Sequence, residues 1–303
     1  MVTNVKMDAR KKRLKEASKV KKISLKLTVP KPEQRPFESL IVGMSGVPGV
    51  GKSRWFEQLG FALQEKYSLN LPAVHMLQCE AVNHRWVLRG SDKEDYIDTW
   101  PTFTKLVDEL ENRPDYVKTV KMWGIDTVDG IVPKILLHLC DAHEVLDPHD
   151  KAWGSIYGES QDELECAILR LRSMGPGVML FSHERSVEVR RGKVTVPQAN
   201  PDMSEKMRNR MLALCSMWIR MRPEAAGGKE RRGRRCLVAV EGDTEYAKDN
   251  YDVVRGRYPN GVIGFDTERE AVDKLLACFS GVKRSKKKVS KHKKSSKKKA
   301  VRR

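Results

Sequence analysis

The amino-acid sequence predicts an α/β fold in which a mostly parallel central sheet is flanked by helices, with basic tails that we expect to be disordered. Three observations carry this prediction. Apolar runs of strand length alternate along residues 37–281 with longer stretches whose apolar residues recur at helical spacing. A glycine-rich loop joins the first predicted strand to the first predicted helix. Several apolar runs also end in an acidic residue or a histidine, at the edge where open α/β sheets place ligands.

Charge divides the chain into three parts. The 303 residues are 40% hydrophobic and carry a net charge of +18. Residues 1–36 contribute +9 and residues 282–303 contribute +13, and subtracting both from +18 leaves −4 for residues 37–281. We therefore expect a basic flexible N-terminal arm over residues 1–36, one folded domain over residues 37–281, and a lysine-rich disordered tail over residues 282–303.

Neither hydropathy nor cysteine usage indicates a secreted or membrane protein. The chain has no apolar run long enough to span a bilayer, and its N-terminus lacks the apolar segment of a signal peptide. The six cysteines are scattered without a C-x-x-C pair, as is typical of buried thiols in a reducing compartment. We expect a soluble, cytoplasmic protein that makes no membrane contact and has no zinc site.

The first predicted strand, Leu40–Val42, leads into a loop that fits G-x-x-x-x-G-K-[ST], the phosphate-binding P-loop. Its glycines let successive backbone N–H groups converge on an anion, and the following helix adds the positive end of its dipole. We expect Lys52 to contact the β- and γ-phosphates of ATP and Ser53 to ligate Mg²⁺. The alternative is a glycine-rich turn without a binding function, in which the lysine is present by chance. The predicted nucleotide-binding residues are Gly46, Val47, Pro48, Gly49, Val50, Gly51, Lys52, Ser53 and Arg54.

The second and third predicted strands each end in a carboxylate. Residues 73–79 read as a strand followed by Glu80, and residues 81–98 read as a loop before a helix that begins near Trp100. Residues 120–127 read as a strand that delivers Asp126, which resembles a Walker B motif whose carboxylate holds the magnesium water shell. Alternatively, Asp126 or Asp129 only caps the next helix.

The second half of the domain is predicted to be richer in strands. Residues 178–181 form a buried strand followed by His183, which we interpret as a γ-phosphate sensor, although a lone histidine is often structural. Residues 187–189 and 194–196 alternate around a basic tip and predict a β-hairpin. Further predictions are a helix over 203–213, strands over 217–221 and 237–240, a glycine- and arginine-rich loop over 225–235, and a last helix that begins with a capping box at Thr267.

These motifs, in this order, resemble the RecA-like P-loop ATPases of phages, which are often grouped with AAA-family ATP-binding proteins and are related to single-strand-annealing recombinases. The resemblance covers roughly residues 38–280. It implies that Glu80 activates the attacking water, because Thr127 occupies the place where AAA+ enzymes carry the catalytic glutamate. A surface glutamate at a strand end is the alternative. The resemblance also likens Lys248 to a lysine that acts across a subunit interface, although Asn250 departs from the related pattern.

The predicted function is Mg²⁺-dependent ATP binding and hydrolysis in phage DNA recombination, replication or repair, in the host cytoplasm if the chain is phage-encoded. The predicted partner is nucleic acid, preferably single-stranded DNA, bound by the basic tails and by a second candidate, the tip residues Arg190, Arg191 and Lys193. Assembly with further copies of the chain is also compatible with the resemblance. Two alternatives stay open: a small-molecule or nucleoside kinase, and a module that binds ATP without hydrolysing it.

Overall fold

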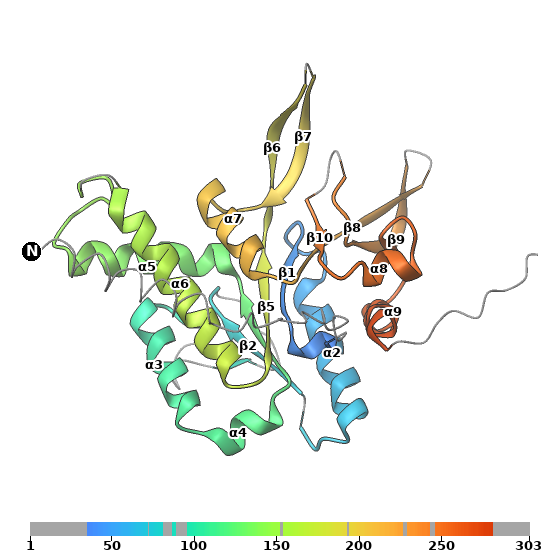
Figure 1. The fold of residues 1–303 in the computed structure, drawn as a ribbon, viewed down its shortest axis with the longest axis horizontal. Helices are drawn as coiled ribbons and strands as arrows, with labels where there is room; N and C mark the ends of the chain where they lie inside the picture. The colour runs from blue at the N-terminus through green and yellow to red at the C-terminus, as the bar shows by residue number, and fades with distance from the viewer. Residues whose placement is uncertain are drawn as a thin grey trace, which may run out of the picture. The chain divides into compact units, whose positions relative to one another are not determined.

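A nine-stranded mixed sheet forms the centre of the molecule and confirms the predicted α/β class (Figure 1). The computed structural model describes residues 35–71, 73–80, 87–88, 96–151, 154–192, 194–226, 229–242 and 246–280. The strand order is β11-β9-β8-β1-β5-β4-β2-β3, and β10 also pairs with β8. The strands are β1 (Ile41–Ser45), β2 (Val74–Gln78), β3 (Val87–Leu88), β4 (Met122–Asp126), β5 (Gly177–Ser182), β8 (Met217–Ala226), β9 (Lys229–Val238), β10 (Lys248–Asp249) and β11 (Val262–Phe265).

The consecutive strands from β8 to β3 in this order are parallel, and their carboxyl ends form one edge of the sheet. Strand β5 lies between β1 and β4, so whatever follows β5 is placed between the ends of those two strands. Residue Ser45 of β1 pairs with Ser182 of β5, and Gln78 of β2 pairs with Asp126 of β4. This register brings the predicted site residues to the same level.

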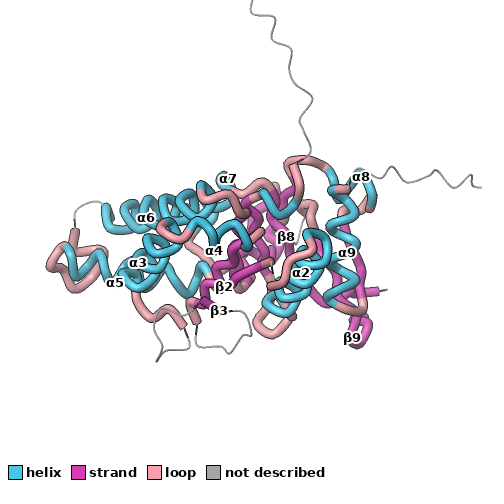
Figure 2. Tube along the Cα trace, turned by 90° about the horizontal axis from the view of Figure 1, so that it is seen from below, coloured by secondary structure: helices cyan, strands magenta, loops and turns pink. Residues whose placement is uncertain are grey.

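The helices cover both faces of the sheet (Figure 2). Alternate residues along each strand point to opposite faces, so Trp123 and Ile125 join one apolar cluster while Met122 joins the other. The first cluster is completed by α3, α5, α6 and α7, and the second by α2, α8 and α9. The helical segments are η1 (Phe37–Ser39), α2 (Lys52–Tyr67), α3 (Trp100–Glu111), α4 (Pro114–Thr119), α5 (Val128–Ala142), α6 (Ser155–Ser173), α7 (Glu205–Leu214), α8 (Val253–Arg257) and α9 (Glu268–Phe279).

A separate two-stranded sheet, made of β6 (Glu184–Arg191) and β7 (Val194–Pro201), projects beyond the central sheet (Figure 1). It confirms the predicted hairpin and extends it to eight residues in each strand. Only His183 separates the end of β5 from the start of β6. The hairpin therefore continues directly from the strand that lies beside the glycine-rich loop.

Two local interpretations were wrong, and some elements were not predicted. The predicted loop over residues 225–235 is largely strand, because β8 and β9 pair antiparallel through Ala225 and Glu230 with a register shift near Pro223. Strand β11 was not predicted. The cap of α5 is neither Asp126 nor Asp129 but Thr127, whose hydroxyl accepts a hydrogen bond from the Gly130 N–H at 3.1 Å.

Gly124, in the middle of β4, is required by the packing of this strand. A Cβ atom at this position would lie 2.7 Å from Cε1 of Phe56 and 2.9 Å from Sδ of Met76. Helix α2 therefore packs directly against the backbone of β4 at this point, which only glycine allows.

All six cysteines fall within the described residues and are free thiols. Five are buried, while Cys166 on α6 is exposed. Burial raises the pKa of Cys215 to about 12 and raises that of Cys79 still further. The helices among the described residues are too short or too polar to cross a bilayer. The predicted arm and tail lie outside the described residues, apart from Arg35 and Pro36.

Candidate functional site

The glycine-rich loop connects the carboxyl end of β1 to the first residue of α2, as the P-loop pattern predicts. Gly49 and Gly51 adopt φ angles of 75° and 105°. Residues that have a Cβ atom rarely adopt this backbone conformation. Gly46 is required for a different reason, because a Cβ atom there would lie 2.6 Å from the carbonyl oxygen of Met221 on β8. The loop is thus a tight turn that is packed against the middle of the neighbouring strand β8.

Lys52 is the first residue of α2 and is almost fully buried. Its Nζ atom donates hydrogen bonds to the carbonyl oxygens of Gly46 at 2.8 Å and Val47 at 3.4 Å. Burial lowers the pKa of the lysine, and the nearby carboxylates led by Asp126 and Asp129 oppose this shift. The amine is therefore a buried cation held within the loop and balanced by acidic groups across the site.

The next residue, Ser53, joins the loop to the end of β4. Its hydroxyl donates a hydrogen bond to Oδ2 of Asp126 at 2.7 Å, although 73 residues separate the two in sequence. Asp126 is 5% exposed and lies at the last position of β4. A hydroxyl oxygen and a carboxylate oxygen so close together form the hard oxygen donor set that Mg²⁺ prefers, and Mg²⁺ keeps several waters in such sites. These residues fit a magnesium ion.

Glu80 follows β2 and lies against the start of α5. Its Oε1 atom accepts a hydrogen bond from the hydroxyl of Thr127, the residue that caps α5. A Cβ atom on Gly130 would lie 2.9 Å from Cγ of Glu80 and 3.1 Å from its Oε1. The glycine thus leaves the space in which the glutamate lies, and the threonine orients one carboxylate oxygen.

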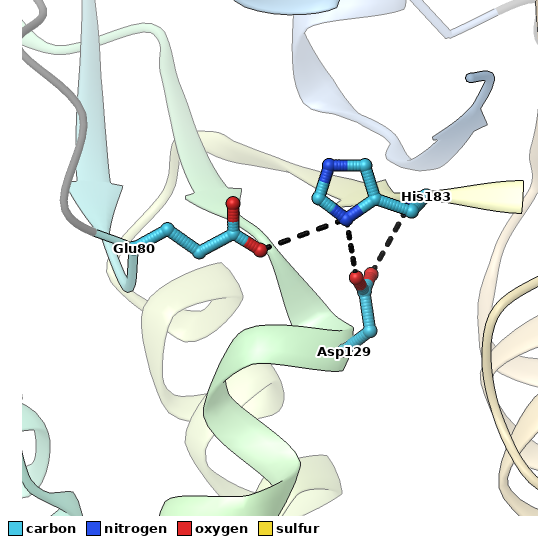
Figure 3. A group of neighbouring side chains, drawn as sticks. All are labelled: Glu80, Asp129 and His183. Atoms are coloured by element: carbon cyan, nitrogen blue, oxygen red, sulfur yellow. Dashed lines mark hydrogen bonds and ion pairs between the residues drawn. The ribbon is translucent and has the colours of Figure 1, made fainter. Parts of the chain in front are cut away.

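His183 lies between two carboxylates that come from different elements (Figure 3). Its backbone N–H donates to Oδ1 of Asp129 at 3.0 Å, and its Nδ1 atom lies 2.7 Å from Oδ2 of the same residue. Oε1 of Glu80 is 3.6 Å from Nδ1, whereas Nε2 lies on the opposite side of the ring (Figure 3). The three residues, which are partly exposed, lie close enough together to share a metal ion, but the hydrogen bonds to Asp129 already account for the position of the ring.

Four further residues at this edge were missed by sequence reasoning about catalysis. Glu184 and Arg220 form a bidentate ion pair, with hydrogen bonds of 2.8 and 2.9 Å, and their side chains are 8% and 14% exposed. Arg220 pairs in register with Ser45, directly before the loop. The other two are Asp129, considered above only as a cap, and Arg235. For the pair of Glu184 and Arg220, the signal in the sequence was that Glu184 directly follows His183.

Comparison with known protein families agrees with this geometry. A family model described as an AAA domain matches residues 38–251, which span the loop, both strand-end carboxylates and His183. The chain belongs to the AAA domain family. Comparison with curated proteins found no match. The family supports a P-loop nucleotide-binding domain, and the structure supplies the mostly parallel sheet that such a domain requires.

In this AAA domain, the side chain of Lys248 forms hydrogen bonds within its own chain. The Nζ atom of Lys248 donates to the carbonyl oxygens of Leu212 at 2.7 Å and Cys215 at 3.0 Å, at the end of α7. Unbonded carbonyl groups at a helix end require donors of this kind. The predicted action of Lys248 across a subunit interface would require these hydrogen bonds to be broken.

A cavity of about 260 Å³ adjoins the His183 cluster through Asp129. Its lining combines apolar side chains with hydroxyl, amide and charged groups. Its lining includes Asp129, Val132, Pro133, Leu136, Tyr157, Ser160, Gln161, Arg185, Asp202, Met203, Ser204 and Met207. Pro133 lies inside α5 and has no N–H, so it cannot donate to the carbonyl of Asp129 four residues earlier. The cavity is thus connected, through one aspartate, to the histidine beside the P-loop.

The remaining predicted contact residues are those of the hairpin tip and Arg54. Arg190 belongs to β6 near the hairpin turn, and its Nε atom donates to the carbonyl of Gly192 at 3.3 Å. Arg191 is the last residue of β6, and Lys193 lies outside the described residues. Arg54 is exposed on the first turn of α2, where its charge helps to lower the pKa of Glu268.

Proposed function

We propose that this AAA domain is a Mg²⁺-dependent ATPase that acts on DNA, in phage recombination, replication or repair. One observation supports the ATPase assignment above all others. The hydroxyl of Ser53 and the carboxylate of Asp126 meet at 2.7 Å, next to a buried P-loop lysine. This arrangement joins a phosphate-binding loop to a metal-binding carboxylate, which is the pair of groups that phosphoryl transfer needs.

The proposed division of labour follows from the chemistry of each group. The backbone N–H groups of the loop and the amine of Lys52 bind the phosphates, and Ser53 and Asp126 hold the magnesium ion with its waters. The ion, when bound, neutralises charge that develops on the phosphate oxygens. Glu80 accepts a proton from the attacking water, and the hydroxyl of Thr127 keeps its carboxylate oriented.

His183 is proposed to sense the γ-phosphate with Nε2. A phosphate offers only acceptor oxygens, so Nε2 must carry a proton to bind it. The contact between Nδ1 and Asp129 also requires a proton, because the carboxylate is an acceptor. In this proposal Nδ1 faces Asp129 and Nε2 faces the γ-phosphate, and the role of Asp129 is to orient the ring.

DNA binding is supported by the distribution of basic residues. The acidic folded part carries basic segments of +9 and +13 at its two ends, and its hairpin ends in two arginines. Such segments bind phosphate backbones without reading base sequence. The setting in phage DNA metabolism rests on the resemblance to RecA-like ATPases.

A kinase is the second candidate, because the cavity beside Asp129 provides a place for an acceptor molecule. Its lining includes hydrogen-bonding groups, and one of the lining residues, Asp129, contacts His183. A carboxylate in that position could accept the proton of an acceptor hydroxyl. A module that binds ATP without hydrolysing it is the third outcome of the test.

The deciding experiment measures phosphate release from ATP by the full chain in Mg²⁺, with and without single-stranded DNA, and searches for phosphorylated nucleosides by mass spectrometry. We expect phosphate release that DNA accelerates and that Lys52→Ala abolishes. Phosphorylated acceptors would assign a kinase instead. Tight ATP binding without turnover under either condition would leave only the binding module.

A further inference from the structure

Arg235 lies on β9, in a segment that was predicted to be a loop, and reaches the P-loop from there. Its Nη1 atom donates a hydrogen bond to the carbonyl oxygen of Val50 at 3.1 Å, across 185 residues of sequence. The same nitrogen donates to Oε1 of Glu268 at 2.7 Å, on the first turn of α9. One guanidinium therefore connects the loop to the last strand pair and the last helix of the described domain.

The contact is close and leaves no space for a side chain on the loop. A Cβ atom on Gly51 would lie 2.5 Å from Nη1 of Arg235 and 3.2 Å from Oε1 of Glu268. Gly51 is therefore required both by its φ angle of 105° and by the arginine that packs against it.

The surroundings keep the arginine in this position. Its guanidinium lies over the ring of Phe265 with the two centres 5.2 Å apart, and its side chain is 22% exposed. Burial alone would raise the pKa of Glu268, but the hydrogen bond from Arg235, a backbone hydrogen bond and the charges of Arg235 and Arg54 together outweigh it, and the net pKa is lowered. Glu268 is thus a carboxylate, 16% exposed, that orients the guanidinium.

Peptide geometry gives this contact a consequence for the nucleotide. The Val50 carbonyl and the Gly51 N–H belong to one trans peptide, so they point in opposite directions. Anchoring the carbonyl outward, toward Arg235, directs the Gly51 N–H inward, toward the concave side of the loop. The next residue along the chain is Lys52.

We propose that Arg235 is a positioning residue for the nucleotide site, and that Glu268 holds Arg235 in place. This inference rests on the proposed binding of ATP at the P-loop. Arg235 acts through the Val50–Gly51 peptide and not by touching the substrate. Its loss disorders a phosphate-binding N–H group while Asp126 and Glu80 stay in place.

The test compares Arg235→Ala and Arg235→Lys with Arg269→Ala in the full chain. Arg269 is a matched control, because it lies on the same helix as Glu268 and donates to Glu65 of α2 at 2.7 and 3.1 Å, without a contact to the P-loop. We expect Arg235→Ala to raise the Kd and KM for ATP about tenfold or more, as for a lost hydrogen bond to a charged group, with a smaller change in kcat. Arg235→Lys should lie between the parent and Arg235→Ala, and Arg269→Ala should match the parent.

Hydrogen exchange of the P-loop amides in nucleotide-free protein adds a readout that does not depend on turnover. Exchange should be faster in both Arg235 variants than in Arg269→Ala. Parent-like Kd and exchange in Arg235→Lys would overturn the inference even if Arg235→Ala failed to fold. A parent chain that binds no ATP would overturn the proposed function itself, and this inference with it. The parent's own ATP titration therefore distinguishes the two failures.

Discussion

At the scale of single residues, the two strand-end carboxylates are expected to fail in different ways. Glu80→Gln should bind Mg²⁺-ATP normally but hydrolyse it at least about a hundredfold more slowly, because an amide cannot accept the proton from water. Asp126→Asn should instead raise the Mg²⁺ concentration needed for half-maximal activity, because it weakens the donor pair with Ser53. Magnesium titrations of steady-state turnover measure both effects. Equal and mild losses in the two variants would contradict the assignment of Glu80.

His75 predicts how stability depends on pH. Burial lowers the pKa of this β2 side chain to about 4, and its Nδ1 atom lies 3.0 Å from the hydroxyl of Tyr116. Because the unfolded chain takes up the proton near pH 6.5, stability is full above that pH and falls as the pH drops toward 4. The loss between pH 7 and pH 5 should be on the order of 2 kcal/mol.

Urea unfolding at pH 7 and pH 5 measures this loss. The parent should be compared with His75→Gln, in which the loss should be much smaller, and with His149→Gln, which removes an exposed histidine and should titrate like the parent. If His75→Gln kept the whole pH dependence, other groups would be responsible.

Some site residues could be predicted from local sequence patterns. Lys52 belongs to the P-loop pattern, whereas Asp126 and His183 lie at the polar ends of apolar runs. Arg235 could not be predicted in this way. Its contact with Val50 depends on the pairing of β9 with β8 and on the packing of α9, and no short pattern encodes either.

At the scale of elements, replacing glycine by alanine is expected to have opposite effects on stability at two positions. Gly124 lies where α2 packs against β4, whereas Gly158 lies on α6 with open space around it. Gly124→Ala should destabilise the fold by about 1–3 kcal/mol, because the new methyl group would overlap with Phe56 and Met76. Gly158→Ala on α6 meets no atom within 4 Å and should stabilise the fold by roughly 0.5–1 kcal/mol. Thermal or urea unfolding measures both. A neutral Gly124→Ala would show that α2 and β4 can move apart.

The elements themselves were predicted where apolar periodicity was clear. The parallel strands have nearly continuous apolar runs because both of their faces are covered, and this made them visible in sequence. The first part of strand β9, before the predicted strand that begins at Leu237, was missed because it is rich in arginine and glycine. It becomes a strand because β8 supplies the hydrogen-bonding partner, which is a tertiary effect.

At the scale of the whole molecule, deleting residues 283–303 should weaken DNA binding uniformly across sequences. This segment has no aromatic residue on which bases could stack, so only phosphate contacts are lost. The slope of log affinity against log salt on single strands should decrease in magnitude by about 0.7 for each contact removed. Filter binding at several salt concentrations measures this slope, and ATPase activity without DNA should be unchanged. The same affinity and slope after truncation would move the contact to the rest of the chain, with the basic tip residues Arg190, Arg191 and Lys193 as the next candidate.

The distribution of the thiols allows the native chain to be labelled at a single cysteine. Cys166 is exposed on α6, whereas the other five cysteines are buried and Cys79 and Cys215 have raised pKa values. A maleimide dye should therefore couple once to the folded protein and six times after denaturation, as intact-mass spectrometry would count. More than one rapid adduct on the folded chain would show that a second thiol is accessible. A single adduct would place a fluorophore on the helix that lines the cavity beside Asp129, without any substitution in the protein.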